Sequence, residues 1–182
     1  DASGTAALAD FDAVLVGGAA LPAPALERAE AAGVRIHRTY GMTETSGGCV
    51  YDGTPLTGVH VRLDEGRVLL GGPVLASEYV DDPALTAERF TTDAHGQRWF
   101  RTDDVGELDG RGRLHLLGRI DDVINTGGLK VAPRTVEDAL HDLPDVREVV
   151  VLGVPDPEWG QRVAAVVVPA DPGQGPPSVK SL

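Results

Sequence analysis

The sequence is poor in cysteine, in aromatic residues and in positive charge, and each shortage narrows what the protein can be. Cys49 is the only cysteine among 182 residues, so no internal disulfide can form, which is compatible with a reducing cytoplasm. Only 16 Lys and Arg residues stand against 28 Asp and Glu residues, giving a formal net charge of −12. This acidity argues against a broad surface for nucleic acid or for an anionic membrane.

Long hydrophobic runs are also missing. No apolar run reaches the roughly 18 residues needed to cross a bilayer, so we expect no membrane insertion. The five histidines show no paired metal-ligand spacing, so we expect no structural zinc. The sequence contains 42% hydrophobic residues, which is typical of a globular protein. Because the chain is acidic overall, any anionic ligand must be held by a local arrangement of hydrogen-bond donors or positive charges.

The first part of the chain has the pattern of a parallel sheet. A short apolar run at 13–16 predicts a strand, Pro22 or Pro24 opens a predicted helix that ends near Ala32, and 34–37 predicts a second strand. Strand, helix and strand in this order favour a parallel pair. Ligands of such sheets bind beyond the carboxyl ends of the strands.

The pattern changes twice further along the chain. Short strands separated by Asp- and Gly-rich turns predict an antiparallel β subdomain, with strands at 59–64, 67–71, 105–108 and 114–117 and a helix at 82–90. Beyond it, a hairpin, a helix and two strands predict a separate α+β domain, at 123–131, 133–140, 146–154 and 163–168.

Tyr40, Gly41, Thr43 and Glu44 combine an aromatic ring, a flexible glycine, a hydroxyl and a carboxylate, just past a predicted strand. An aromatic ring can stack on a purine, a hydroxyl can donate to phosphate, and a carboxylate can hold Mg²⁺ against phosphate oxygens. Taken alone, the same residues also fit a strand-to-helix turn in which Thr43 caps the helix and Glu44 favours its dipole.

A second polar group contains Asp103 and Asp104, which follow Phe100-Arg101-Thr102. The carboxylate of Asp104 has enough acceptor sites for two hydroxyl donors, although two neighbouring aspartates are also typical of a solvated turn. Arg119, taken alone, fits a surface ion pair.

These segments, at 40–44, 99–104 and 118–131, together resemble the adenylate-forming enzymes: acyl-CoA synthetases, luciferases and the adenylation domains of peptide synthetases. The resemblance implies an α/β plus α+β fold. Residues 1–117 would be the back half of the large nucleotide-binding domain, a parallel sheet unit followed by the antiparallel β subdomain at 59–117. Residues 118–182 would be a truncated small C-terminal α+β domain.

The resemblance also implies roles for single residues. Tyr40 would stack on adenine, Thr43 would bind phosphate, and Glu44 would bind Mg²⁺. Asp104 would accept the ribose hydroxyls, and Arg119 would reach ribose and phosphate; Thr43, Glu44 and Arg119 are the expected catalytic residues. The other expected nucleotide-binding positions are Gly17, Gly18, Ala19, Gly41 and Lys130.

Three further positions follow from the same resemblance. Asp121 matches the hinge about which the small domain rotates, and Gly127 and Gly128 match the loop that leaves room for the pantetheine arm of CoA. Asp103 stands where the family has glycine, which puts a second negative charge close to the ribose. Either Asp103 points to solvent or the loop is adjusted.

The implied activity is the ATP- and Mg²⁺-dependent joining of a carboxylic acid to AMP, followed by transfer of the acyl group to CoA. Residues 43–53 and 124–131 are most similar to the o-succinylbenzoate–CoA ligases of menaquinone biosynthesis. Two alternatives stay open: another fatty-acyl or aryl-CoA ligase or a carrier-protein adenylation domain, and a catalytically inactive binding or structural piece. The family's phosphate-binding loop and terminal catalytic lysine do not occur here, so we expect the 182-residue chain alone to be inactive. The sequence does not determine the oligomeric state, and a homo-oligomer is one possibility.

Overall fold

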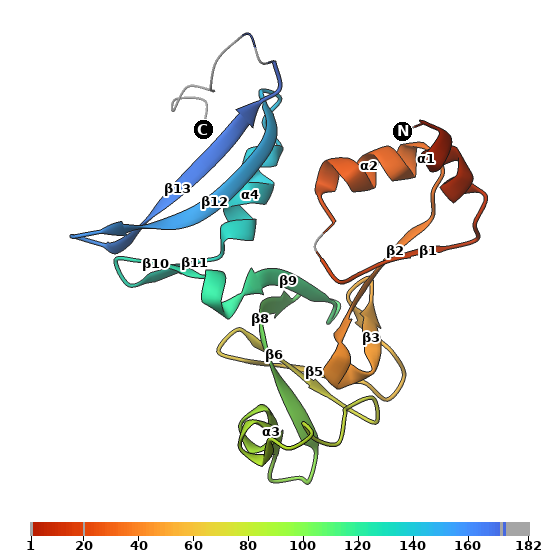
Figure 1. Ribbon diagram of the computed structural model, residues 1–182, viewed down its shortest axis with the longest axis vertical. Helices are drawn as coiled ribbons and strands as arrows, with labels where there is room; N and C mark the ends of the chain where they lie inside the picture. The colour runs from red at the N-terminus through yellow and green to blue at the C-terminus, as the bar shows by residue number, and fades with distance from the viewer. Residues whose placement is uncertain (1, 20, 172, 174–182) are drawn as a thin grey trace. The chain divides into compact units, whose positions relative to one another are not determined.

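The computed structural model describes residues 2–19, 21–171 and 173 (Figure 1). The chain divides into two compact units. Unit 1 comprises Asp1–Thr102 and Gly106–His115, and unit 2 comprises Asp103–Val105 and Leu116–Leu182. The expected antiparallel and α+β character is confirmed in these units. The assignment of residues 1–117 to a large domain and 118–182 to a small one stays a prediction.

The first sheet of unit 1 contains the predicted parallel pair. Strand β1 (Val14–Val16) pairs in parallel with β2 (Ile36–Met42), and helix α2 (Ala23–Ala31) connects them (Figure 1). A proline lies in the first turn of α2, where its missing N–H removes no helical hydrogen bond. The preceding helix α1 (Ala2–Ala9) was not predicted.

Strand β2 is longer than the sequence pattern indicates. It pairs antiparallel with β3 (Gly47–Tyr51), which pairs in turn with β4 (Thr54–Pro55). The expectation that Tyr40 and Gly41 follow the strand is therefore wrong, because both lie within β2. The glycines that begin β3 hide it from a pattern search, since glycine weakens a strand signal.

The predicted antiparallel subdomain is confirmed as a second sheet. Its strands follow the order β5-β6-β8-β7, with β9 also paired to β8. The bounds are β5 (His60–Asp64), β6 (Arg67–Gly71), α3 (Pro83–Arg89), β7 (Phe90–Thr92), β8 (Arg98–Leu108) and β9 (Leu114–Arg119). Strand β8 begins well before the predicted start at residue 105. Asp103 and Asp104 consequently lie in a strand and not in a turn.

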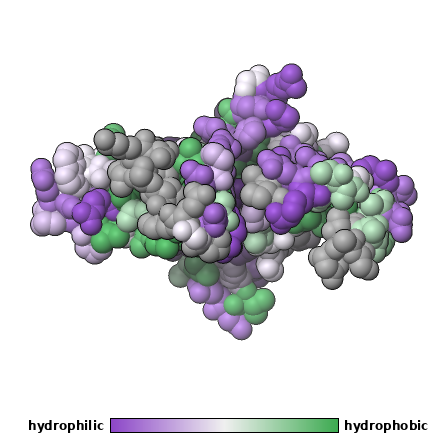
Figure 2. Space-filling model, turned by 90° about the horizontal axis from the view of Figure 1, so that it is seen from above, coloured by the Kyte–Doolittle hydropathy of each residue, from purple (hydrophilic) through white to green (hydrophobic). Residues whose placement is uncertain are grey.

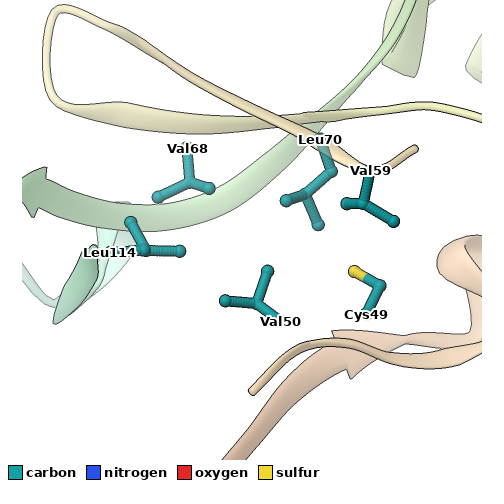
Figure 3. Close-up of a cluster of buried hydrophobic side chains, with 6 residues drawn as sticks. All are labelled: Cys49, Val50, Val59, Val68, Leu70 and Leu114. Atoms are coloured by element: carbon teal, nitrogen blue, oxygen red, sulfur yellow. The ribbon is translucent and has the colours of Figure 1, made fainter. Parts of the chain in front are cut away.

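The core of unit 1 lies between these two sheets (Figure 3). The figure shows side chains of β3 facing those of β6 and β9; the buried members are Cys49, Val50, Val59, Val68, Leu70 and Leu114. Cys49 is fully buried, and this burial raises the pKa of its thiol above the ordinary value, although a hydrogen bond with Thr45 opposes the shift. Cys49 is thus a packed core residue.

Unit 2 contains the predicted hairpin, helix and strand pair. Its sheet follows the order β11-β10-β13-β12. The bounds are η2, a short 3-10 helix (Ile120–Asp122), β10 (Ile124–Thr126), β11 (Leu129–Val131), α4 (Pro133–His141), β12 (Val146–Asp156) and β13 (Gly160–Pro169). Helix α4 lies beside β12 (Figure 1) and packs Val136 and Leu140 against a buried cluster that includes Val149 and Val151. Because Glu137 of α4 accepts a 2.9 Å hydrogen bond from the Val151 N–H, the helix also covers the edge of β12.

Hydrophilic residues cover much of the face drawn in Figure 2, and hydrophobic residues gather there in separate patches. Among the described residues, the longest helices are α2 and α4, with 9 residues each. Within the described ranges, no helix is long and apolar enough to span a membrane.

Candidate functional site

The loop that carries Thr43 and Glu44 is held by Thr45, which the sequence analysis did not single out. The Met42 N–H donates to Oγ1 of Thr45 at 2.9 Å, and the Thr45 hydroxyl lies 2.8 Å from the carbonyl oxygen of Gly47. Thr45 is only 2% exposed. A hydroxyl residue placed to cap the short 3-10 helix η1 (Thr43–Thr45) was the available signal. Thr45 thus holds the turn, while Thr43 stays exposed.

Gly41 has a structural reason to be glycine. A Cβ built there would lie 2.0 Å from the carbonyl oxygen of Gly47 and 2.8 Å from its carbonyl carbon, closer than real Cβ atoms come. The neighbouring Tyr40 is half-buried and packs against the core of unit 1. The close approach of β2 to β3 therefore sets where Tyr40 and Thr43 lie.

Glu44 is half-buried, and its carboxylate has a defined partner. The Tyr79 hydroxyl donates to Oε1 of Glu44 at 2.6 Å, and the Ala76 N–H donates to the Glu44 carbonyl oxygen at 2.8 Å. Tyr79 was not identified from sequence, because it lies 35 positions from Glu44.

The donor set around Glu44 fits a magnesium ion shared with a ligand. No group of three or more His, Cys, Asp or Glu side chains that could hold a metal occurs among the residues that the structure describes. Mg²⁺ in proteins is commonly bound by one or two carboxylates, with phosphates and waters completing its octahedron. A lone carboxylate beside a loop hydroxyl is compatible with Mg²⁺ that arrives with a polyphosphate.

Asp103, Asp104 and Arg119 form a charged cluster within unit 2. Arg119 lies 3.5 Å from Oδ2 of Asp103 and 3.8 Å from Oδ1 of Asp104. The side chains of Asp103 and Asp104 are 29% and 18% exposed, whereas that of Arg119 is 54% exposed. Asp103 is therefore engaged by Arg119 and does not simply point to solvent. The second negative charge is countered by a guanidinium that still reaches water.

The strand leading to these aspartates is anchored by Thr102. Its hydroxyl donates to the Val68 carbonyl oxygen at 2.8 Å, and Arg67 donates to the Thr102 carbonyl oxygen at 2.9 Å. Thr102 is 1% exposed, so its hydroxyl is committed to packing β8 against β6. Thr102 therefore stabilises the pairing of β8 with β6.

The segment Gly17-Gly18-Ala19 is exposed after β1. A Cβ at position 17 would lie 2.2 Å from Oγ1 of Thr39, so the approach of this segment to β2 explains Gly17. Gly18 has a φ of +82°, a conformation that glycine adopts readily, and a Cβ at this position would have no neighbour within 4 Å.

The paired glycines after β10 are held by the turn between β12 and β13 and by the start of β13. The Gly127 N–H donates to the Trp159 carbonyl oxygen at 2.9 Å, and the Asn125 N–H donates to Oε1 of Gln161 at 2.8 Å. A Cβ at position 127 would lie 2.3 Å from a ring carbon of Trp159. Trp159 therefore packs directly on the glycine loop, a contact that sequence spacing alone did not indicate.

The expected site residues are only partly brought together in the described units. Within unit 1, Tyr40, Thr43 and Glu44 follow one another at the end of β2; within unit 2, Asp104 lies beside Arg119. Lys130 in β11 and Asp121 in η2 are exposed. The convergence of all these residues on one nucleotide stays a prediction.

Comparison with known proteins gives the family. The AMP-binding enzyme C-terminal domain matches residues 135–182. The whole chain is 48% identical over 185 residues to a probable 2-succinylbenzoate–CoA ligase of Mycobacterium tuberculosis and spans 46% of that protein's length. It is also 34% identical to a feruloyl-CoA synthase of an Amycolatopsis species, with 92% of this chain and 38% of the relative covered.

This chain is also similar to a solved structure. The o-succinylbenzoate CoA synthetase of Bacillus subtilis, in complex with the acyl-adenylate intermediate OSB-AMP, matches with a TM-score of 0.73 and 28% identity, covering 89% of this chain and 37% of that one. The chain belongs to the adenylate-forming, AMP-binding enzymes, as its three motifs indicated. It spans less than half the length of the relatives it matches.

Proposed function

We propose that this chain is part of an AMP-forming acid–CoA ligase of the cytoplasm, and that the acid is o-succinylbenzoate, a step of menaquinone biosynthesis. The observation that carries the proposal is the Asp104–Arg119 pair, with 3.8 Å between their charged groups. It sets a carboxylate able to accept ribose hydroxyls beside a guanidinium able to contact phosphate. The similarity to the mycobacterial ligase supports the choice of acid.

In the first half-reaction, a carboxylate oxygen of the acid attacks the α-phosphorus of ATP, and the bond to pyrophosphate breaks. Tyr40 stacks on the adenine, Thr43 donates its exposed hydroxyl to phosphate, and Arg119 offsets phosphate charge. Glu44 would hold Mg²⁺, which when bound would neutralise charge on the phosphates. The segment 17–19 lines the adenine and acyl pocket.

In the second half-reaction, the CoA thiolate attacks the acyl carbon, the bond between that carbon and the phosphate oxygen breaks, and AMP leaves. Rotation of the small domain about Asp121 would let the protein perform both steps, as domain closures commonly do. Gly127 and Gly128 leave room for the pantetheine arm, and Lys130 contributes positive charge near phosphate. The turn containing Trp159 keeps this loop in shape.

The proposal predicts AMP release by the protein encoded by the full reading frame when it receives ATP, Mg²⁺, CoA and o-succinylbenzoate. AMP would be quantified with each of three acids: o-succinylbenzoate, ferulate and a long-chain fatty acid. We expect release with o-succinylbenzoate and none from the 182-residue chain alone. Activity with ferulate or the fatty acid only would contradict o-succinylbenzoate as the substrate but would agree with the proposed ligase activity. No AMP with any acid would reject the ligase itself.

A second prediction concerns Gly127. Gly127→Ala should slow CoA-dependent AMP release from preformed acyl-AMP by about tenfold, because the methyl group displaces the loop from Trp159. Pyrophosphate release in the first half-reaction should not change. The matched control is Gly128→Ala: Gly128 also has positive φ, +86°, but nothing lies within 4 Å of its Cβ position. Equal slowing in both variants would show that backbone strain or lost room for the pantetheine arm, and not the Trp159 contact, is responsible.

A further inference from the structure

Tyr79 makes a close contact with the Glu44 carboxylate. The distance of 2.6 Å between the tyrosine hydroxyl and Oε1 is in the range of charge-assisted O–H···O⁻ hydrogen bonds, which are stronger than neutral ones. Both side chains are half-buried. The bond therefore restricts a carboxylate whose side chain would otherwise sample several rotamers.

The segment that carries Tyr79 is itself anchored on both sides. Arg98 donates to the Ala76 carbonyl oxygen at 2.6 Å, and the Ala76 N–H donates to the Glu44 carbonyl oxygen. On the other side, the Tyr79 N–H donates to Oγ1 of Thr86 at 2.9 Å. Because the backbone before and at Tyr79 is fixed, its hydroxyl is aimed at Glu44 before any ligand binds.

We propose that Tyr79 is a positioning residue for metal binding by Glu44: it engages Oε1 and so favours ligation of a divalent cation through the other carboxylate oxygen alone. This inference rests on the proposed function, in which Glu44 holds Mg²⁺ against ATP. Mg²⁺ demands a compact octahedron, whereas Ca²⁺ also accepts bidentate carboxylates in a looser shell. Tyr79 therefore also favours Mg²⁺ over Ca²⁺ at this site.

The test is Tyr79→Phe in the full-length protein, which removes the hydroxyl and keeps the ring that packs against Phe90 at 5.7 Å between centroids. ATP binding would be measured by calorimetry while Mg²⁺ or Ca²⁺ is varied. We expect the Mg²⁺ concentration for half-maximal ATP binding to rise about tenfold, the effect of losing one hydrogen bond to a charged group. The Ca²⁺ requirement should change by less than about twofold, so the preference for Mg²⁺ falls.

The matched control is Ser46→Ala. The Ser46 hydroxyl donates to the Val74 carbonyl oxygen at 3.1 Å, so it joins the same two segments without touching the carboxylate. We expect unchanged metal requirements in this variant. In a Glu44→Gln background, Tyr79→Phe should not change the Mg²⁺ requirement further, because the carboxylate through which Tyr79 acts has been removed.

Unchanged Mg²⁺ dependence in a folded Tyr79→Phe variant would overturn the inference, as would an effect that persists undiminished with Glu44→Gln. If the phenylalanine variant does not fold, Thr86→Val removes the hydroxyl that accepts from the Tyr79 N–H and so loosens the segment that aims the tyrosine. The Mg²⁺ concentration for half-maximal ATP binding should then rise in the same direction; an unchanged concentration in the folded variant would contradict the idea. A wild-type protein that binds no ATP with either metal would instead reject the proposed function.

Discussion

Gly41→Ala should destabilise the protein by about 3 kcal/mol, at the upper end of what an overpacked site costs. The added methyl group meets backbone atoms of Gly47, which cannot move aside as a flexible side chain can. Any relief must separate β2 from β3, and this displaces Tyr40 and Thr43 together. Urea unfolding would give the loss of stability, and calorimetry on the full-length variant would show weaker ATP binding.

Two other glycines provide a graded comparison. At Gly48 the nearest atoms to an added Cβ are side-chain atoms of Thr39 and Tyr51 at 3.3 Å, so Gly48→Ala should cost less than Gly41→Ala. At Gly110 nothing lies within 4 Å, so Gly110→Ala should stay within about 0.5 kcal/mol of the parent. Equal stability of the Gly41 and Gly110 variants would contradict the close approach of the two strands.

Asp104→Ala in the full-length protein should weaken ATP binding about 100-fold. Two hydrogen bonds from ribose hydroxyls to a carboxylate together contribute roughly 3 kcal/mol, which corresponds to this change in the dissociation constant. Asp104→Asn should have an intermediate effect, because the amide keeps one acceptor oxygen. The dissociation constant would be measured by calorimetry at saturating Mg²⁺, with the unfolding temperature followed in parallel.

The neighbouring carboxylate supplies the control for this prediction. Asp103 lies on the same strand and 3.5 Å from the same arginine, but the family pattern has no carboxylate at its position. Asp103→Ala should therefore change ATP affinity by less than about threefold, the scale of a partly exposed ion pair. Equal losses of ATP affinity in both variants would mean that the two aspartates act only through their electrostatic interaction with Arg119.

Elements with a strong local signal could be predicted from sequence. The predictions for α2, α3, α4 and β6 agree closely with the structure, because proline at a helix start and apolar periodicity act within each segment. The missed strands β3, β4 and β7 are short or begin with glycine, and they exist because a neighbouring strand pairs with them. For the same reason, β2 and β8 extend beyond their predicted bounds.

The order of residues along the chain was enough to establish the family and to nominate Tyr40, Glu44, Asp104 and Arg119, because side chains that suit adenosine and phosphate keep a recognisable spacing. Folding decided their surroundings. Tyr79 meets Glu44 from 35 positions away, and Arg119 reaches across to Asp103 and Asp104 on another strand. Strand pairing and loop packing alone set such distances, since they bring together segments that no local pattern connects.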